Sequence, residues 1–141
     1  MSSHILDTDV LSEVLAGDQR LTGRLLSVPP VDRATTIVTV DEIVRGRTAV
    51  VRRAEGGGKP DLVTAYRRLH ETLDDLRRLT VLPYDGRADV QFESLRSLVR
   101  GKVGTHDLRI AAIAMSRGGT VVTRNRHHFR EIPGLQVEFW E

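Results

Sequence analysis

Four oxygen-bearing side chains occupy positions at which they could meet and bind a cation. They are Asp7, Glu42, Asp107 and Asn125, each placed just after an expected strand or near the start of an expected helix. Carboxylates held close together repel one another, and this repulsion raises their pKa values. A hard divalent cation removes the conflict, and ligands that are all oxygens favour Mg²⁺ or Mn²⁺. The residue types therefore predict a magnesium or manganese site if the fold brings these positions together.

Each of these residues also has an ordinary structural explanation when it is considered alone. Thr39 and Glu42 have the spacing of a capping box, in which the Glu side chain reaches back to the N–H at the start of a helix. Asp107 lies in the first turn of its expected helix, where a negative charge is stabilising. Asn125 fits a turn. Asp7 is the hardest to explain in this way, because a carboxylate at the buried end of a strand needs partners.

The elements that must position these residues alternate between strands and helices. Runs of β-branched and apolar residues predict strands at about 4–6, 34–40, 80–82, 120–123 and 135–139. Helical spacing of apolar residues predicts helices at about 10–15, 18–26, 39–54, 60–79, 85–100 and 105–117. Thr8 or Asp9 is the expected cap of the first helix, and Val90, Leu95, Leu98 and Val99 are expected to face inward. The alternation predicts an α/β fold with a largely parallel sheet, whose ligands bind at the carboxyl ends of the strands.

The strongest break in the chain is the run of glycines at 56–58. The segment before it is too small for a core of its own, so we interpret the run as the turn of a helical hairpin. Pro60 is expected in the first turn of the second helix. The apolar residues of this hairpin exceed what one small core needs, which favours a dimer. The alternative is that they pack against the sheet of their own chain.

Composition limits the remaining possibilities. The 141 residues make one domain, 1–141, and 21 basic against 19 acidic residues give a net charge of only +2. Nineteen of the basic residues are Arg, whose planar fork suits phosphate, although they are scattered. The absence of Cys excludes disulfides and thiolate zinc sites. We expect a cytoplasmic protein and no membrane association, since neither a secretion signal nor a long apolar run is visible.

Four segments, in the same order along the chain, resemble the PIN-domain nucleases and especially the VapC toxins of bacterial type II toxin–antitoxin systems. They are Ile5-Leu6-Asp7-Thr8-Asp9-Val10-Leu11-Ser12-Glu13, Thr39-Val40-Asp41-Glu42-Ile43-Val44-Arg45-Gly46, Thr105-His106-Asp107-Leu108-Arg109-Ile110-Ala111-Ala112 and Val122-Thr123-Arg124-Asn125-Arg126-His127-His128-Phe129. Each motif is weak alone. Four of them in order, over nearly the whole chain, make a specific resemblance.

The resemblance implies a three-layer α/β/α PIN-like domain with a central, mostly parallel sheet and a projecting helical hairpin. By resemblance, Asp7, Glu42 and Asp107 hold one or two Mg²⁺ or Mn²⁺ ions, and Asn125 orients a water. The family often carries an acid three residues after the Asn125 position, where this chain has His128. The hydroxyls of Thr8 and Thr123 are expected to support the metal ligands.

The same resemblance implies an activity and partners. The chain would be a metal-dependent endoribonuclease that hydrolyses RNA phosphodiesters, with a VapB-type antitoxin as its cognate partner and a homodimer as its assembly. Arg45, Arg124 and Arg126 lie in or beside the motif loops, which makes them candidates for phosphate contacts. Their ordinary explanation is solvated surface charge.

Two other functions compete with this one. A haloacid-dehalogenase-type phosphatase would use Asp7 as nucleophile, but it needs a Lys near the phosphate and a late acidic pair. Lys59 and Lys102 are the only lysines, and residues 118–130 contain no Asp or Glu. A PIN-like module that binds RNA or a partner without cutting stays open, because the late acid is missing. A histidine metal site is disfavoured, since His127 and His128 lack the i, i+4 spacing of zinc pairs.

Overall fold

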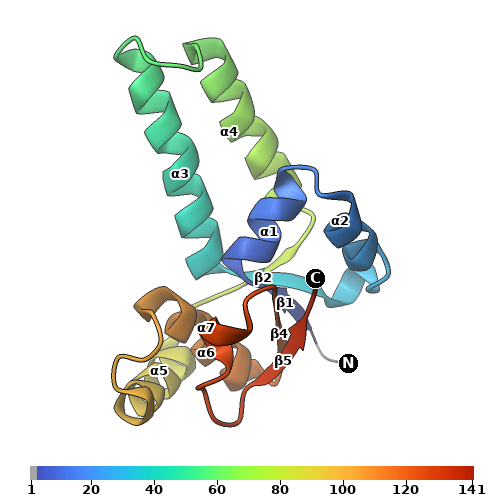
Figure 1. Cartoon of the computed structure of the whole chain (residues 1–141), viewed down its shortest axis with the longest axis vertical. Helices are drawn as coiled ribbons and strands as arrows, with labels where there is room; N and C mark the ends of the chain where they lie inside the picture. The colour runs from blue at the N-terminus through green and yellow to red at the C-terminus, as the bar shows by residue number, and fades with distance from the viewer. Residues whose placement is uncertain (1–2) are drawn as a thin grey trace.

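The computed structural model of the chain describes residues 3–141, and a parallel sheet lies at its centre (Figure 1). The strands are β1 (His4–Leu6), β2 (Arg33–Thr36), β3 (Thr80–Leu82), β4 (Thr120–Thr123) and β5 (Gln136–Phe139). Their order in the sheet is β3-β2-β1-β4-β5, with every neighbouring pair parallel. The central strand β1 therefore ends beside β2 and β4, and this end of the sheet gathers residues that are far apart in the sequence.

Helices cover both faces of the sheet. They are α1 (Thr8–Leu15), α2 (Gln19–Leu26), α3 (Ile37–Glu55), α4 (Leu62–Leu76), α5 (Gly86–Val99), α6 (Thr105–Arg117) and the short α7 (Arg126–Phe129), with a 3₁₀ turn at Pro30–Asp32. Side chains alternate along β1, so Ile5 joins the core under α5 and α6, whereas Leu6 joins the core under α1 and α2. This arrangement confirms the expected three-layer α/β/α fold.

The hairpin of α3 and α4 projects from the rest of the molecule, as expected (Figure 1). Residues 56–58 form its turn, where a Cβ at Gly58 would lie 2.9 Å from the Arg53 carbonyl oxygen. Helix α4 begins at Leu62, so Pro60 lies in the turn and the prediction that it starts the helix was wrong.

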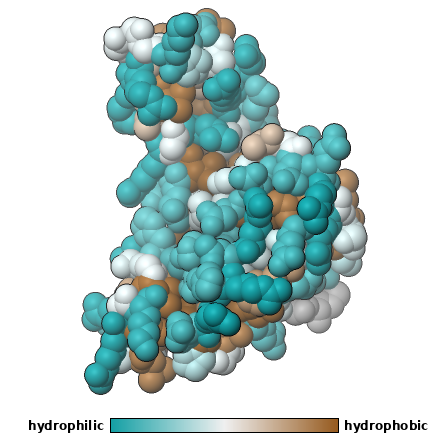
Figure 2. Space-filling view, viewed as in Figure 1, coloured by the Kyte–Doolittle hydropathy of each residue, from teal (hydrophilic) through white to brown (hydrophobic). Residues whose placement is uncertain are grey.

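Several apolar side chains of α4 are exposed. We call them the hairpin patch: Leu62, Val63, Tyr66 and Leu73, which are 40–72% exposed. Hydrophobic side chains also show among hydrophilic ones on the projecting part in Figure 2. The prediction of surplus apolar surface on the hairpin is therefore confirmed for these four residues, whereas the alternative of packing within the chain's own core holds for Leu76.

The starts of two helices differ from the predictions. Asp7, rather than Thr8 or Asp9, caps α1, because its Oδ1 accepts a hydrogen bond from the Val10 N–H at 2.9 Å. Thr36 ends β2 and caps α3 by accepting from the Thr39 N–H at 3.2 Å. The predicted strand at 34–40 therefore ends four residues too late, and the Thr39–Glu42 capping box is wrong.

Helix α5 buries part of the expected face, since Leu95 and Val99 are buried as predicted. Its buried residues are Ala88, Phe92, Leu95 and Val99, spaced at helical intervals against α6. Val90 and Leu98 point to solvent, with 70% and 65% of their surfaces exposed, so the prediction that they face inward was wrong. In the described part of the chain, no helix combines the length and the apolar character needed to span a bilayer.

Candidate active site

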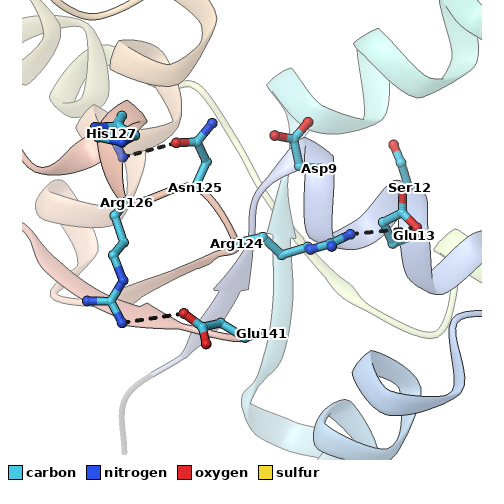
Figure 3. Close-up of a pocket in the computed structure, with 8 residues that line it drawn as sticks. All are labelled: Asp9, Ser12, Glu13, Arg124, Asn125, Arg126, His127 and Glu141. Atoms are coloured by element: carbon cyan, nitrogen blue, oxygen red, sulfur yellow. Dashed lines mark hydrogen bonds and ion pairs between the residues drawn. The ribbon is translucent and has the colours of Figure 1, made fainter.

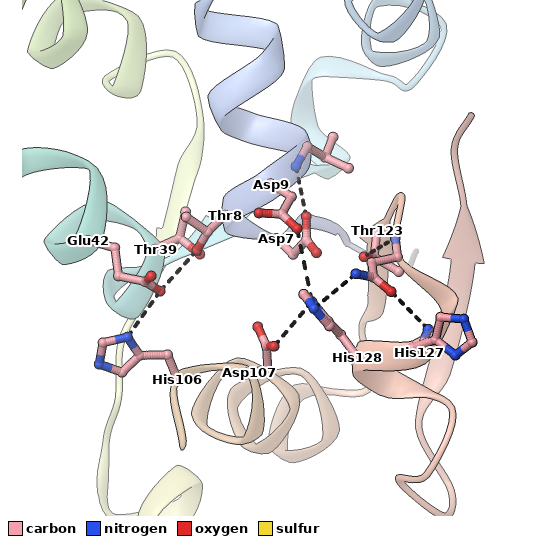
Figure 4. Close-up of polar contacts among 12 residues, drawn as sticks. Asp7, Thr8, Asp9, Thr39, Glu42, His106, Asp107, Thr123, His127 and His128 are labelled. Atoms are coloured by element: carbon pink, nitrogen blue, oxygen red, sulfur yellow. Dashed lines mark hydrogen bonds and ion pairs between the residues drawn. The ribbon is translucent and has the colours of Figure 1, made fainter. Parts of the chain in front are cut away.

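A cavity of about 420 Å³ opens where β1 ends and the first turns of α1 and α6 meet α3 and α7 (Figure 4). We call it the acidic cavity. Its lining consists of Asp7, Thr8, Asp9, Glu42, Gly104, Thr105, His106, Asp107 and His128. The structure thus brings together the three carboxylates that the sequence singled out, and it adds a fourth from Asp9.

Asp7 is the most buried of these carboxylates, with 2% of its surface exposed. Its backbone N–H donates to the Val122 carbonyl oxygen at 3.0 Å, which fixes the residue at the end of the sheet. Burial raises the pKa of Asp7 to about 6, and the charges of Asp9 and Asp107 add to this rise. Hydrogen bonds from Thr123 and the Val10 N–H oppose it. The two hydrogen bonds therefore compensate only part of the unfavourable burial of the Asp7 charge.

Glu42 faces the cavity from the second turn of α3, one turn later than expected because the helix begins at Ile37. Its Oε1 accepts a hydrogen bond from Thr8 Oγ1 at 3.1 Å. The same oxygen lies 3.4 Å from Nδ1 of His106. The expectation that the Thr8 hydroxyl supports a carboxylate thus agrees with the geometry, and His106 is a partner that the sequence did not indicate.

Asp107 lies in the first turn of α6, as expected. Burial raises the pKa of its carboxyl group, and the neighbouring Asp9 and Glu42 act in the same direction, while His128 lowers it. His128 Nδ1 lies 3.3 Å from Asp107 Oδ2. The pKa values of Asp7 and Asp107 are both raised, so the ionised form of each carboxyl group is less favourable in this cavity than in water.

Asn125 is placed differently from the expectation. It does not line the acidic cavity; it caps α7, and its Nδ2 lies 2.9 Å from His128 Nε2. Its backbone N–H donates to the hydroxyl of the buried Thr123 at 3.0 Å. The amide therefore contacts a side chain that lines the cavity, His128, and the start of α7.

Two of the three candidate arginines line a second cavity of about 570 Å³, which we call the arginine cavity (Figure 3). Its lining consists of Asp9, Ser12, Glu13, Arg124, Asn125, Arg126, His127 and Glu141. Arg124 pairs with Glu13 at 3.7 Å, and Arg126 pairs with Glu141 at 3.6 Å. Asp9 belongs to both linings, so the two cavities adjoin.

Arg45 is not brought to this region. Its side chain is 73% exposed on α3 and pairs with Asp41 at 3.1 Å, one turn back along the same helix. It lines neither the acidic cavity nor the arginine cavity. Of the arginines proposed from the sequence, only Arg124 and Arg126 therefore lie beside the candidate site.

Sequence reasoning missed Asp9, His106 and the place of His128. Asp9 had a detectable signal, since it lies two residues after Asp7 in a helix start that points at the same edge of the sheet. His106 directly precedes Asp107, yet its pairing with Glu42 depends on how α3 and α6 pack. The contact of His128 with Asp107 likewise joins α7 to α6, which no local spacing reveals.

The donor set of the acidic cavity suits a hard divalent cation. Four carboxylates line one space, and burial disfavours the charged form of Asp7 and Asp107. Within residues 3–141, no three His, Asp or Glu side chains lie close enough together as they stand to hold a metal ion. Asp7, Glu42 and Asp107 are the residues that would hold the ion, and a positive charge among them would relieve their repulsion.

Comparison with known proteins places the chain among related sequences. The family model described as PIN domain matches residues 4–135. The "tRNA(fMet)-specific endonuclease VapC" of Salmonella typhimurium is 41% identical over 68 residues, which are 46% of this chain and 52% of that protein. "Ribonuclease VapC2" of Rickettsia felis is 32% identical over 69 residues, 47% of this chain and 52% of that protein. The chain spans about half the length of the curated relatives it matches.

Solved structures agree with this placement over the full chain. The DNA-bound VapBC structure from Salmonella typhimurium has a chain that superposes with a TM-score of 0.83, at 27% identity and over 100% of both chains. A chain of VapBC2 from Rickettsia felis, bound to a promoter DNA fragment, has a TM-score of 0.77 over 98% of each chain. At 20% identity, this second likeness shows the fold alone. With the family model spanning most of its length, the chain belongs to the PIN domain family.

Proposed function

We propose that this protein is a metal-dependent endoribonuclease and the toxin of a VapBC-type toxin–antitoxin pair. The observation that carries the proposal is the acidic cavity, in which Asp7, Glu42 and Asp107 come together from three separate segments of a PIN domain. Burial raises the pKa of Asp7 and Asp107 in it. Carboxyl groups whose pKa values are raised by burial occur most often at functional sites.

The chain's own residues would divide the work among them. Asp7, Glu42 and Asp107 bind Mg²⁺ or Mn²⁺, both of which prefer oxygen ligands. The bound ion supplies a Lewis acid that activates water and stabilises charge on a phosphodiester under attack. Thr8 holds the Glu42 carboxylate toward the cavity through its hydrogen bond of 3.1 Å. The Thr123 hydroxyl supports Asp7 in the same way.

RNA is the proposed substrate, and the arginine cavity supports this choice. Arg124 and Arg126 lie next to the acidic cavity and are paired with single carboxylates at 3.6–3.7 Å, distances at which exposed pairs are weak. A phosphate group can replace a surface carboxylate as the partner of an Arg fork. The backbone beside the scissile phosphate would therefore lie along the arginine cavity. Both curated relatives described above have names that give RNA cleavage as their activity.

An antitoxin and a second copy of the chain are the proposed partners. Solved relatives with similar folds are VapBC structures, including the DNA-bound one from Salmonella typhimurium. The exposed hairpin patch adds surface that a protein partner would cover. A toxin that cleaves cellular RNA would act in the cytoplasm.

The phosphatase alternative loses its remaining support. A phosphate-binding Lys would have to reach Asp7, but Lys59 lies in the turn of the projecting hairpin and Lys102 follows α5. Neither lines the acidic cavity. The alternative of a PIN-like module that binds without cutting is decided by the experiment below.

Induced expression of the wild type and of Asp7→Asn, followed by mapping of RNA 5′ ends, tests the proposed function. We expect growth arrest and new, discrete RNA ends with the wild type only, because Asn keeps the helix cap but removes the charge. Co-expression of the antitoxin should relieve the arrest. Arrest by Asp7→Asn equal to that by the wild type, or arrest without new RNA ends, would contradict the proposal.

A further inference from the structure

The acidic cavity is closed on one side by an imidazole that stands between two carboxylates. His128 Nδ1 lies 3.3 Å from Asp107 Oδ2 and 4.0 Å from Asp9 Oδ2. Figure 4 shows the ring reaching from α7 toward both acids. On the opposite side of the cavity, Glu42 pairs with His106 and Thr8. Imidazole rings thus lie against carboxylates on both sides of the cavity, but only His128 stands between two of them.

Asn125 fixes which nitrogen of this ring carries the proton. Its Oδ1 accepts a hydrogen bond from the His127 backbone N–H at 3.0 Å, so the start of α7 sets the orientation of the amide. Its Nδ2 can only donate, and it lies 2.9 Å from His128 Nε2. Nε2 is therefore the acceptor, and the ring proton lies on Nδ1, where it faces Asp107.

This arrangement determines what the ring can do toward a cation. A nitrogen that carries a proton has no lone pair for a metal ion, so His128 as held is not a ligand. Its Nδ1 instead lies 3.3 Å from Asp107 Oδ2 and 4.0 Å from Asp9 Oδ2, so the positive end of the N–H stands between the two acids. A cation bridging those two carboxylates would have to displace the ring from both Asp107 and Asn125.

We propose that the acidic cavity holds a single divalent cation and that His128, oriented by Asn125, takes the place of a second one. The proposal rests on the proposed function, because it concerns the ion that this function requires. His128 acts as a positioning residue: it holds one oxygen of Asp107 and leaves the remaining carboxylate oxygens of the cavity to one ion.

Mn²⁺ titration of the metal-free full chain, followed by calorimetry and electron paramagnetic resonance, tests this inference. We expect one Mn²⁺ per wild-type chain, with the six-line spectrum of an isolated ion. His128→Asp should bind two Mn²⁺ per chain, and coupling between neighbouring ions should broaden that spectrum. His127→Asp is the matched control: it adds the same charge at the adjacent, exposed position and should still bind one.

Each outcome decides the question. Two ions in the wild type, one ion in a folded His128→Asp, or two ions in His127→Asp would each overturn the inference. The wild-type count tests the single-ion claim even if His128→Asp fails to fold. Two ions in the wild type would leave the proposed function standing, whereas no Mn²⁺ binding by the wild type would overturn both.

Discussion

The acidic cavity and the hairpin patch are both incomplete in the isolated chain, but in different physical ways. The cavity gathers four carboxylates from the start of α1, from α3 and from α6, and burial makes the charge on Asp7 and Asp107 unfavourable. The hairpin patch contains no charged side chain; it exposes apolar side chains of α4 to water. A positive charge would stabilise the acidic cavity, and burial against another apolar surface would stabilise the hairpin patch. We therefore propose a small ion as the missing component of the cavity and a protein surface as that of the projecting helices.

The largest effect should come from changing a carboxylate of the cavity while leaving its neighbour as control. Glu42→Gln removes a charge that faces the cavity, and we expect RNA cleavage to fall by more than about 100-fold. Asp41→Asn changes the adjacent carboxylate, which pairs with Arg45 outside the cavity, and should keep the rate within about twofold. Initial rates at saturating Mg²⁺ measure both. Equal losses in the two variants would mean that the cavity is not the site of cleavage.

The base of the hairpin should behave as core, unlike its exposed patch. Leu76 at the end of α4 is 4% exposed and belongs to the same buried cluster as Leu6 and Trp140. Leu76→Ala should therefore lower the free energy of unfolding by about 2–5 kcal/mol, measured by urea denaturation. A change no larger than that of a surface substitution would show that the hairpin is poorly anchored to the sheet.

Asp7 should make the metal-free protein less stable as the pH rises. Its folded pKa of about 6 lies above the unfolded value of 3.8, so the charged form is disfavoured by folding. The cost is absent below the unfolded pKa, grows between the two values and is complete above about pH 6. Asp7→Asn keeps the cap of α1 but carries no charge at any pH. It should raise the free energy of unfolding by up to about 3 kcal/mol at pH 7.5.

Denaturation with a chelator present, at pH 7.5 and at pH 3.5, checks this dependence. The wild type and Asp7→Asn should be similar at the lower pH and should separate at the higher one. Saturating Mn²⁺ should stabilise the wild type and leave Asp7→Asn nearly unchanged, because the ion provides the missing counter-charge. A variant that is less stable than the wild type at pH 7.5 without metal would contradict the role assigned to burial.

The smallest effect on stability should come from the hairpin patch. Val63 is 72% exposed, so Val63→Ser should change the free energy of unfolding by less than about 0.5 kcal/mol. The same variant should weaken self-association or antitoxin binding, measured by sedimentation and by co-purification. If assembly is unaffected, the partner covers another surface and the contrast between the two regions is weaker than proposed.

Patterns within single segments predicted most of the fold. The β-branched run at 120–123 and the apolar helix at 105–117 appear with the predicted bounds, since both are strongly periodic. The end of β2 was misplaced because residues 37–40 are β-branched and apolar yet lie in a helix. The Thr36 hydroxyl caps that helix, and this local cap outweighs the strand propensity of Ile37 and Val38.

The site residues that the sequence predicted correctly are those that directly follow a strand or lie at the start of a helix. Asp7 and Asp107 lie at such positions, and the parallel sheet brings them together. Asn125 was assigned to the cavity from the same rule, but its amide serves the cap of α7 and the ring of His128. Both partners lie within three residues of Asn125, so the local cap of α7 orients this amide, and the rule based on strand ends does not include such a cap.

Cation-dependent RNA cleavage by the purified chain is the most direct test of the central claim. Structured RNA should be cut by the wild type with Mg²⁺ or Mn²⁺, should stay intact with a chelator, and should be cut again when the ion is restored. Asp107→Asn should show no cleavage under any of these conditions. Intact RNA with the wild type and either ion, or equal cutting by Asp107→Asn, would contradict the assignment of the acidic cavity as a ribonuclease site.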